Sequence, residues 1–308
     1  RLLSVSSSDR DDRGAALAPL LVLAAAMLWG TSGTAQELAP PGSTPLMIGG
    51  VRVAIGGLTL VASAAVRGEL LPARGFLRPV ILLAGVMQVV FNVSYFTALS
   101  RTGVAVGTMV AIGSAPIFAG VLGIFFDRDP VKRSWYGATG MAIIGLVLLS
   151  VAGGELSVSL PGIAAALMAG FSYSAYTFLT RRLIARYTPD AVMGVSFLVA
   201  AMILLPFLAT GPVEWMRGPA GVGTVLYLGV ISSGAAYMLY GRGLRMVPVA
   251  HVGTLTLAEP LTAALLGILF LRESVSLSSV LGMVLIFAGQ VVVVTAQRSP
   301  KRRLRGSD

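Results

Sequence analysis

Ten long apolar stretches, separated by connections too short to hold another domain, constrain this chain more than any other feature of its sequence. A helix that crosses a bilayer needs about 20 predominantly apolar residues, and each stretch is about that long. The chain is 56% hydrophobic and only 12% charged, whereas soluble domains are about one quarter charged. The sequence therefore predicts an all-α integral membrane protein with ten transmembrane helices. We expect these helices at residues 15–36, 45–66, 79–99, 104–126, 136–152, 160–180, 190–210, 220–240, 248–271 and 277–296.

The distribution of basic residues predicts the orientation of these helices. Of the 23 Lys and Arg residues, 19 lie on the side of the N-terminus, 3 lie on the other side, and Arg52 lies within a span. Loops rich in Lys and Arg stay in the cytoplasm. We therefore expect a multi-pass protein of the plasma (inner) membrane with both termini cytoplasmic. The net charge of +10 then reflects topology rather than nucleic-acid binding.

The two halves of the chain resemble each other at an offset of about 144 residues. Matching residues recur in the same order: Trp29 with Tyr173, Gly50-Val51 with Gly194-Val195, Gly85-Val86 with Gly229-Val230, and Pro116 with Pro260. Between the last two matches the register slips by one residue, so that Tyr95 matches Tyr240. Each half holds five spans, and this odd number requires the halves to insert with opposite orientations. Because inverted repeats are typical of transporters with a midplane site, we predict two repeats, residues 1–152 and 153–308, around a central cavity.

Polar and aromatic side chains concentrate in six of the ten spans. In the third span, Gln88, Asn92 and Tyr95 share one helical face because they are spaced i, i+4, i+7, and the eighth span repeats this spacing. We expect spans 1, 3, 4, 6, 8 and 9 to enclose the cavity, and spans 5 and 10 to face lipid or to form a homodimer. For any single residue, hydrogen bonding or aromatic packing between helices is the alternative. The expected substrate-binding residues are Trp29, Gln88, Asn92, Tyr95, Tyr173, Tyr176, Ser233, Tyr237, Tyr240, Thr254 and Glu259.

Two charged residues and two prolines lie inside the predicted spans. Arg52 and Glu259 need partners, since an unpaired charge in the bilayer interior is costly. They could pair with each other as a clamp or gate, bind the carboxylate and the amine (or a proton) of a solute, or face water separately. Pro116 and Pro260 each remove a backbone donor, and we expect both to kink their helices. The half-helix that begins at Pro260 would direct its N-terminal dipole towards the midplane.

The residue types present argue against catalysis. The chain has no Cys and one His, which excludes Cys nucleophiles and His-rich metal sites. Ser233 and His251 invite comparison with a serine hydrolase, but we expect their depths to differ by roughly 7–8 Å, too far for a nucleophile and its base. His251 is expected at the rim of the cavity. The sequence contains no nucleotide-binding loop of the G-x-x-x-x-G-K-[ST] type. We expect no cofactor, and proton coupling remains open.

Several segments resemble one family. They are Trp29-Gly-Thr-Ser-Gly-Thr-Ala-Gln36, Tyr173-Ser-Ala-Tyr-Thr-Phe-Leu-Thr-Arg-Arg182, Leu257-Ala-Glu-Pro260, Leu271-Arg-Glu273, and Gly282 through Gly289. With Arg52 and Asp129, they make the chain similar to the drug/metabolite transporter superfamily, specifically the EamA type. Two positions depart from the family pattern, since Tyr173 stands where Trp is frequent and Ala115-Pro116 lacks an acid before the proline. The resemblance implies a ten-helix, inverted-repeat exporter of small metabolites, closest to bacterial amino-acid and metabolite exporters.

These observations together predict a secondary transporter that exports amino acids or similar small zwitterionic metabolites by alternating access. A multidrug or other metabolite exporter of the same superfamily is the first alternative. A channel and an intramembrane enzyme are alternatives from other classes. The expected partners are a small-molecule substrate and the lipid bilayer, with no nucleic acid.

Overall fold

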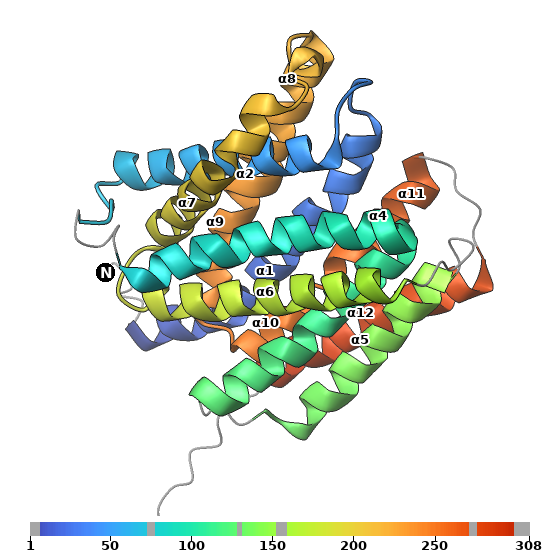
Figure 1. Ribbon diagram of the computed structural model, residues 1–308. Coiled ribbons are helices and arrows are strands. Elements are labelled where there is room, and N and C mark those ends of the chain that lie inside the picture. The colour runs from blue at the N-terminus through green and yellow to red at the C-terminus, as the bar shows by residue number, and fades with distance from the viewer. Residues whose placement is uncertain (1–6, 73–77, 128–130, 152–158, 271–275, 299–308) are drawn as a thin grey trace, which may run out of the picture.

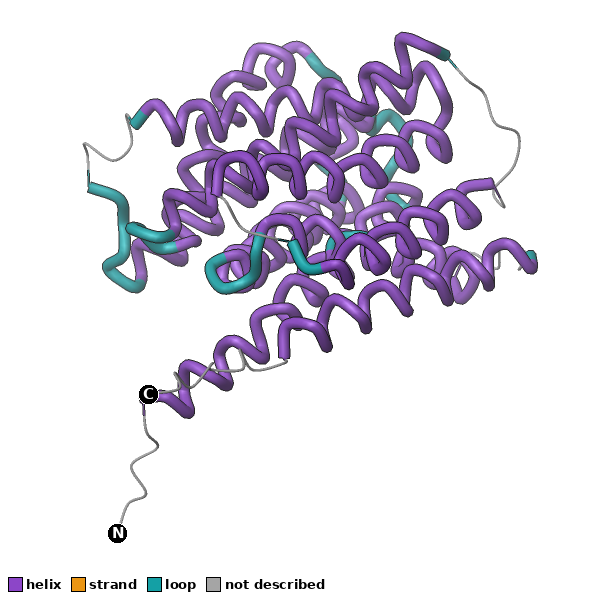
Figure 2. The backbone as a smooth tube through the Cα atoms, turned by 90° about the horizontal axis from the view of Figure 1, so that it is seen from below, coloured by secondary structure: helices purple, strands orange, loops and turns teal. Residues whose placement is uncertain are grey.

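The computed structural model describes residues 7–72, 78–127, 131–151, 159–270 and 276–298. These residues form helices and short loops, with no strand among them (Figures 1 and 2). The helices of the first half are α1 (Ser7–Glu37), α2 (Pro45–Val66), α4 (Pro79–Leu122), the π-helix η1 (Gly123–Asp127) and α5 (Arg133–Val151). Those of the second half are α6 (Leu160–Ile184), α7 (Pro189–Thr210), η2 (Glu214–Met216), α8 (Pro219–Leu226), the π-helix η3 (Tyr227–Ala235), α9 (Ala236–Leu244), α10 (Val249–Leu255), α11 (Ala258–Phe270) and α12 (Leu277–Arg298).

The predicted all-helical membrane fold is confirmed. The described part of the chain contains 10 helical segments that are long and apolar enough to cross a membrane. The sixth and eighth extend further than predicted, to Ile184 and Leu244. Their extra turns carry Arg181, Arg182 and Arg242. Basic side chains suit the carbonyl end of a helix and reach the polar interface with their heads, so these helices continue beyond their apolar residues.

A glycine joins the third and fourth spans almost without a loop. Gly103 has φ 76° and ψ 164° and is the one residue with non-helical dihedral angles inside α4. Positive φ is readily accessible to glycine and strained for other residues. Gly103 therefore allows the chain to end one span and to begin the next in the reverse direction.

The pattern of helix contacts is symmetric when the two halves are exchanged. The second and seventh spans (α2 and α7) pack against each other, and so do the fifth and tenth (α5 and α12). The first span, α1, contacts η3, α9 and α11. Its counterpart α6 contacts α4 on both sides of Gly103, at Phe91 and at Ala111. This is the pattern expected of two repeats related by a twofold axis. Their opposite orientation in the membrane stays a prediction.

A π-helix accounts for the one-residue slip between the repeats. The eighth span is α-helical over α8, π-helical over η3 and α-helical again over α9, whereas the third span is α-helical at the equivalent positions. A π-helix closes i→i+5 hydrogen bonds and so accommodates an additional residue along the helix. The slip falls between the Gly85–Gly229 match and the Tyr95–Tyr240 match, within which most of η3 lies.

Glycines bring α5 and α12 into backbone contact. A Cβ atom added at Gly145 would lie 2.6 Å from the backbone oxygen of Gly282, and one at Gly282 would lie 2.6 Å from that of Gly145. Small residues that permit such close approach are typical of membrane helix pairs. The outward sides of the pair expose Ile144, Val284 and Phe287. These surfaces suit lipid or a second copy of the chain, and the homodimer remains a prediction.

Candidate functional site

Trp29 of α1 lies at the centre of a buried aromatic cluster that joins both repeats. Its ring centroid is 6.4 Å from that of Tyr173, 4.9 Å from that of Tyr237 and 5.1 Å from that of Tyr240. Tyr173 comes from α6, and Tyr237 and Tyr240 come from α9. Ring pairs at such distances stabilise a structure by about 0.5–1.5 kcal/mol each beyond their burial. We call Trp29, Tyr173, Tyr237 and Tyr240 the Trp29 cluster.

Hydrogen bonds connect the hydroxyl groups of this cluster to α4 and α6. The Tyr173 hydroxyl donates to the Tyr240 hydroxyl at 3.3 Å, and the hydroxyls of Tyr240 and Thr177 share a bond of 2.7 Å. Gln88 Nε2 donates to the Tyr237 hydroxyl at 3.5 Å. The structure thus brings together predicted site residues from spans 1, 3, 6 and 8.

Three buried polar atoms in and beside the Trp29 cluster are unsatisfied. Trp29 Nε1, Gln88 Oε1 and the Tyr176 hydroxyl have no hydrogen-bond partner among the described residues. The Tyr176 ring lies 6.3 Å from that of Tyr237. An unsatisfied buried polar group costs about 1–3 kcal/mol. A polar solute that reached these atoms would recover part of that free energy, which makes them suited to binding.

Tyr95 and Asn92, predicted to share a face with Gln88, are directed differently. Tyr95 is linked to the Trp29 cluster through Phe91, whose ring centroid lies 5.6 Å from Tyr95 and 5.9 Å from Tyr173. Asn92 lies against α2, since a Cβ atom at Gly49 would be 3.2 Å from its side-chain oxygen. Tyr95 is therefore at one end of the aromatic group, whereas Asn92 is part of a helix–helix contact.

Ser233 and Thr254 face neighbouring helices, and His251 is buried. Ser233 lies in η3 beside α2, where a Cβ atom at Gly56 would be 2.7 Å from Ser233 Cβ. The additional residue in η3 changes which side of the helix Ser233 occupies. Thr254 shares a 2.7 Å hydrogen bond with Thr139 of α5. His251, expected at a cavity rim, is 8% exposed within α10.

Arg52 and Glu259 form no direct ion pair with each other. No nitrogen–oxygen distance of 4.0 Å or less joins Arg52 to Glu259 in the described structure. Arg52 lies in a narrow crevice beside Trp215. The clamp in which these two residues bind each other directly is therefore not formed here.

The ninth span is interrupted immediately before Glu259. Helix α10 ends at Leu255 and α11 begins at Ala258, so Pro260 occupies the first turn of α11, where a missing N–H costs little. Pro116 lies inside α4 without a break in helical dihedral angles. It is a packing position, because a Cβ atom at Gly253 would lie 2.9 Å from Pro116 Cα.

Two motif positions singled out in the sequence, Asp129 and Glu273, lie outside the described residues. Within the described part of the chain, no group of three or more His, Asp or Glu side chains is arranged to hold a metal ion.

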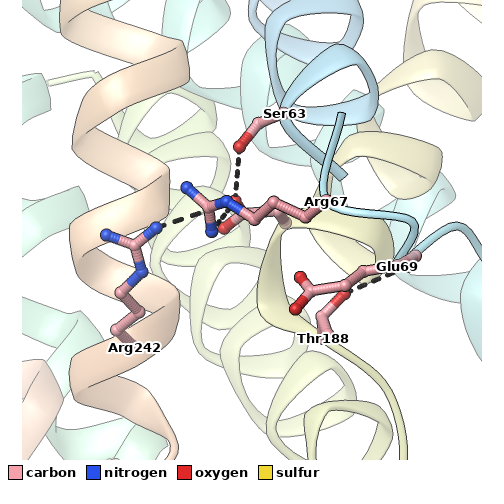
Figure 3. Close-up of polar contacts among 6 residues, drawn as sticks. Ser63, Arg67, Glu69, Thr188 and Arg242 are labelled. Carbon is pink, nitrogen blue, oxygen red and sulfur yellow. Dashed lines mark hydrogen bonds and ion pairs between the residues drawn. The ribbon is translucent and has the colours of Figure 1, made fainter. Parts of the chain in front are cut away.

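An ion-pair cluster that sequence reasoning missed lies at the end of α2 (Figure 3). Asp190 Oδ2 accepts hydrogen bonds from Ser63 Oγ at 2.7 Å and from Arg67 Nη1 at 3.1 Å, and lies 3.8 Å from Arg242 Nη2. Asp190 is 2% exposed. This carboxylate joins α7 to α2 of the first repeat and to α9 of its own. The only signal in the sequence is an acid at the start of a span that is otherwise apolar.

Two hydroxyl pairs between α1 and η3 were also missed. Thr31 Oγ1 and the Tyr227 hydroxyl are 2.6 Å apart, and so are Ser32 Oγ and Ser232 Oγ. Thr31 and Ser32 belong to the polar run that follows Trp29 in the sequence. That run was visible, but its partners in η3 could not be assigned without the packing of the two helices.

Comparisons with known proteins agree with this fold. The EamA-like transporter family matches the chain twice, over residues 16–151 and 160–295. An uncharacterized transporter of Bacillus subtilis, YwfM, is 40% identical over 92% of this chain and 95% of its own length. The threonine/homoserine exporter RhtA of Escherichia coli is 30% identical over 88% of this chain and 89% of its own length. A solved crystal structure with 24% identity covers 91% of this chain and 97% of its own with a TM-score of 0.77. With ten membrane-spanning helices built from two matching halves, the chain belongs to the EamA-like transporter family.

Proposed function

We propose that this chain is a secondary transporter that exports amino acids or similar small zwitterionic metabolites by alternating access. The observation that carries the proposal is the Trp29 cluster with its unsatisfied polar atoms, Trp29 Nε1 and Gln88 Oε1. Helices of both repeats meet there, so a rocking motion of one repeat against the other would change access to the cluster from each side of the membrane.

The charges nearby favour a solute that carries both signs. Arg52 is suited to a carboxylate and Glu259 to an ammonium group, and neither is neutralised by a direct ion pair with the other. Gly30 places α1 against the start of α11, since a Cβ atom there would lie 2.6 Å from the backbone oxygen of Glu259. Trp29 and Glu259 are thereby held on adjoining helices.

The name of the Escherichia coli relative supports the same substrate class. Threonine and homoserine are neutral α-amino acids with a hydroxyl group. The tyrosine hydroxyls of the Trp29 cluster and Gln88 offer donors and acceptors for such a group. We further propose that the protein resides in the inner membrane with both termini in the cytoplasm.

The test is counterflow in proteoliposomes made with the purified full chain. Liposomes preloaded with unlabelled threonine or homoserine are expected to accumulate the labelled amino acid in a saturable manner, and protein-free liposomes are not. Absence of exchange for every amino acid of a broad panel, with the protein shown to be folded and inserted, would overturn the substrate class. Exchange of lipophilic cations instead would indicate a multidrug exporter.

Substitution of Arg52 tests how the solute is bound. We expect Arg52→Gln to lower the apparent affinity for threonine about tenfold, the loss of one charge-assisted hydrogen bond of roughly 1.5 kcal/mol. Inhibition of threonine counterflow by threoninol, which lacks the carboxylate, should change little. Equal losses for threonine and threoninol would show that Arg52 acts on the protein's conformation rather than on a carboxylate.

A further inference from the structure

A second polar site lies away from the Trp29 cluster, at the ends of α2 and α9 and the start of α7. It is an open cavity of about 300 Å³. The distribution of basic residues places this end of the helices at the cytoplasmic membrane surface. Its lining residues are Arg67, Glu69, Thr188, Pro189, Asp190, Arg242 and Arg245.

Asp190 holds two of the three arginines in place from beneath. Its carboxylate is 2% exposed, whereas the side chains of Arg67 and Arg242 are 45% and 41% exposed. Both arginines approach the same oxygen, Asp190 Oδ2. A guanidinium group carries five N–H donors in a rigid fork, so donors of both groups remain for a ligand in the cavity (Figure 3).

Positive charge exceeds negative charge in the cavity lining. Three arginines face two acids, Glu69 and Asp190. Arg245 is exposed and forms no ion pair with any described residue. A ligand with one negative charge would balance this lining, and paired arginines are well suited to the oxygens of a phosphate group.

Exposed apolar side chains occur at the same ends of the helices as the cavity. Val66, Leu70 and Met246, at or just beyond the ends of α2 and α9, are 89%, 50% and 46% exposed and lie outside the polar lining itself. A soluble phosphate ion would contact only the guanidinium groups. A ligand that joins a phosphate to hydrocarbon chains would use both the charged lining and its apolar surroundings.

We propose that this cavity binds the phosphodiester headgroup of an anionic phospholipid of the cytoplasmic leaflet. Basic pockets between transmembrane helices on this side of a membrane are typical sites for anionic lipid headgroups. The lipid would bridge Arg67 of the first repeat and Arg242 and Arg245 of the second. It would thereby stabilise the contact between the repeats that Asp190 already makes.

The experiment follows thermal unfolding of the full chain in a neutral detergent. We expect short-chain phosphatidylglycerol to raise the melting temperature with saturation, and phosphatidylcholine or inorganic phosphate at the same concentration to have little effect. Arg245→Gln should weaken the apparent affinity for phosphatidylglycerol about fivefold, as expected for one arginine near an anionic lipid. Glu69→Gln, which removes a negative charge from the lining, should strengthen it.

Arg133→Gln is the matched control, because Arg133 is an exposed arginine at the start of α5, outside the cavity. An equal loss of affinity in this variant would overturn the proposal in favour of general surface charge. Equal stabilisation by phosphatidylcholine would overturn the headgroup assignment, and saturation by inorganic phosphate alone would overturn the lipid as the source of the phosphate. If Arg245→Gln does not fold, an unchanged affinity in Glu69→Gln would count against the site.

Discussion

The packing of α1 explains why Gly30 directly follows Trp29 in the first span. Trp29 fills the aromatic cluster, and the missing side chain at Gly30 lets α1 contact α11. A Cβ atom at Gly30 would lie 2.6 Å from both the Glu259 backbone oxygen and Thr262 Cβ. The two residues therefore combine a large contact surface with a close helix approach.

The charge of Glu259 is expected to be needed for transport rather than for folding. Glu259→Gln keeps the size of the side chain and removes its charge. We expect a fall of about tenfold or more in counterflow rate, since a hydrogen bond to a charged group contributes roughly 1.5–3 kcal/mol, with the melting temperature nearly unchanged. Glu214→Gln is the control, because Glu214 is an exposed residue at the start of η2. Aggregation of Glu259→Gln, with Glu214→Gln still monodisperse, would show a structural role for Glu259.

The sequence predicted which residues share one face of a helix. It predicted less well which neighbouring helix or cluster each of those side chains contacts. Gln88 and Asn92 are one turn apart, and a rotation about the helix axis of a few tens of degrees decides whether each meets the Trp29 cluster or α2. Thr254 illustrates the same limit, because its position on the helix did not reveal that it shares a hydrogen bond with Thr139 of α5. Sequence spacing gives relative positions on one helix, whereas its rotation depends on all of its neighbours.

At the scale of elements, Asp190 connects α7 to α2 and α9 with a single carboxylate. We expect Asp190→Asn to reduce the free energy of unfolding by about 2 kcal/mol, since hydrogen bonds to charged groups contribute roughly 1.5–3 kcal/mol. Chemical denaturation in detergent micelles measures this change. Thr210→Val, at the exposed end of α7, should have an effect near zero. A loss in Asp190→Asn no larger than in this control would contradict the structural role of the cluster.

The contact between α5 and α12 gives a matched pair of glycine substitutions on one helix. Gly145→Ala places a methyl group 2.6 Å from the Gly282 backbone oxygen and should destabilise the protein by about 1–3 kcal/mol. Gly140→Ala, with no atom within 4 Å of the new Cβ, should be neutral or slightly stabilising because alanine favours helix. Equal unfolding midpoints for the two variants would contradict the close packing of α5 on α12.

The elements themselves followed from the sequence because length and hydropathy are enough to define a membrane helix. The π-helix η3 was visible only indirectly, as a one-residue slip between the repeats, and its conformation could not be deduced from that slip. The Asp190 cluster had no periodic signal, since its three helices come together only through the packing of the two repeats. Contacts between segments that are distant in the sequence therefore could not be predicted from it.

At the scale of the whole molecule, the absence of Cys makes the predicted orientation directly measurable. Ala185→Cys lies at the end of α6, on the expected cytoplasmic side, and Gly218→Cys lies before α8, on the expected outer side. A membrane-impermeant maleimide should label Gly218→Cys in intact cells, and Ala185→Cys only after the cells are opened. The reverse pattern would contradict the assignment of both termini to the cytoplasm.

The π-helical segment in the eighth span has an energetic consequence for the molecule as a whole. Two identical halves that exchanged conformations would give inward-open and outward-open states of equal free energy. Here one half carries η3 at the position where the other carries an ordinary α-helix, so an exchange of conformations would not reproduce the starting structure. If the protein works by the alternating access that we propose, its two states would therefore differ in free energy, and their resting populations would be unequal even without a solute gradient.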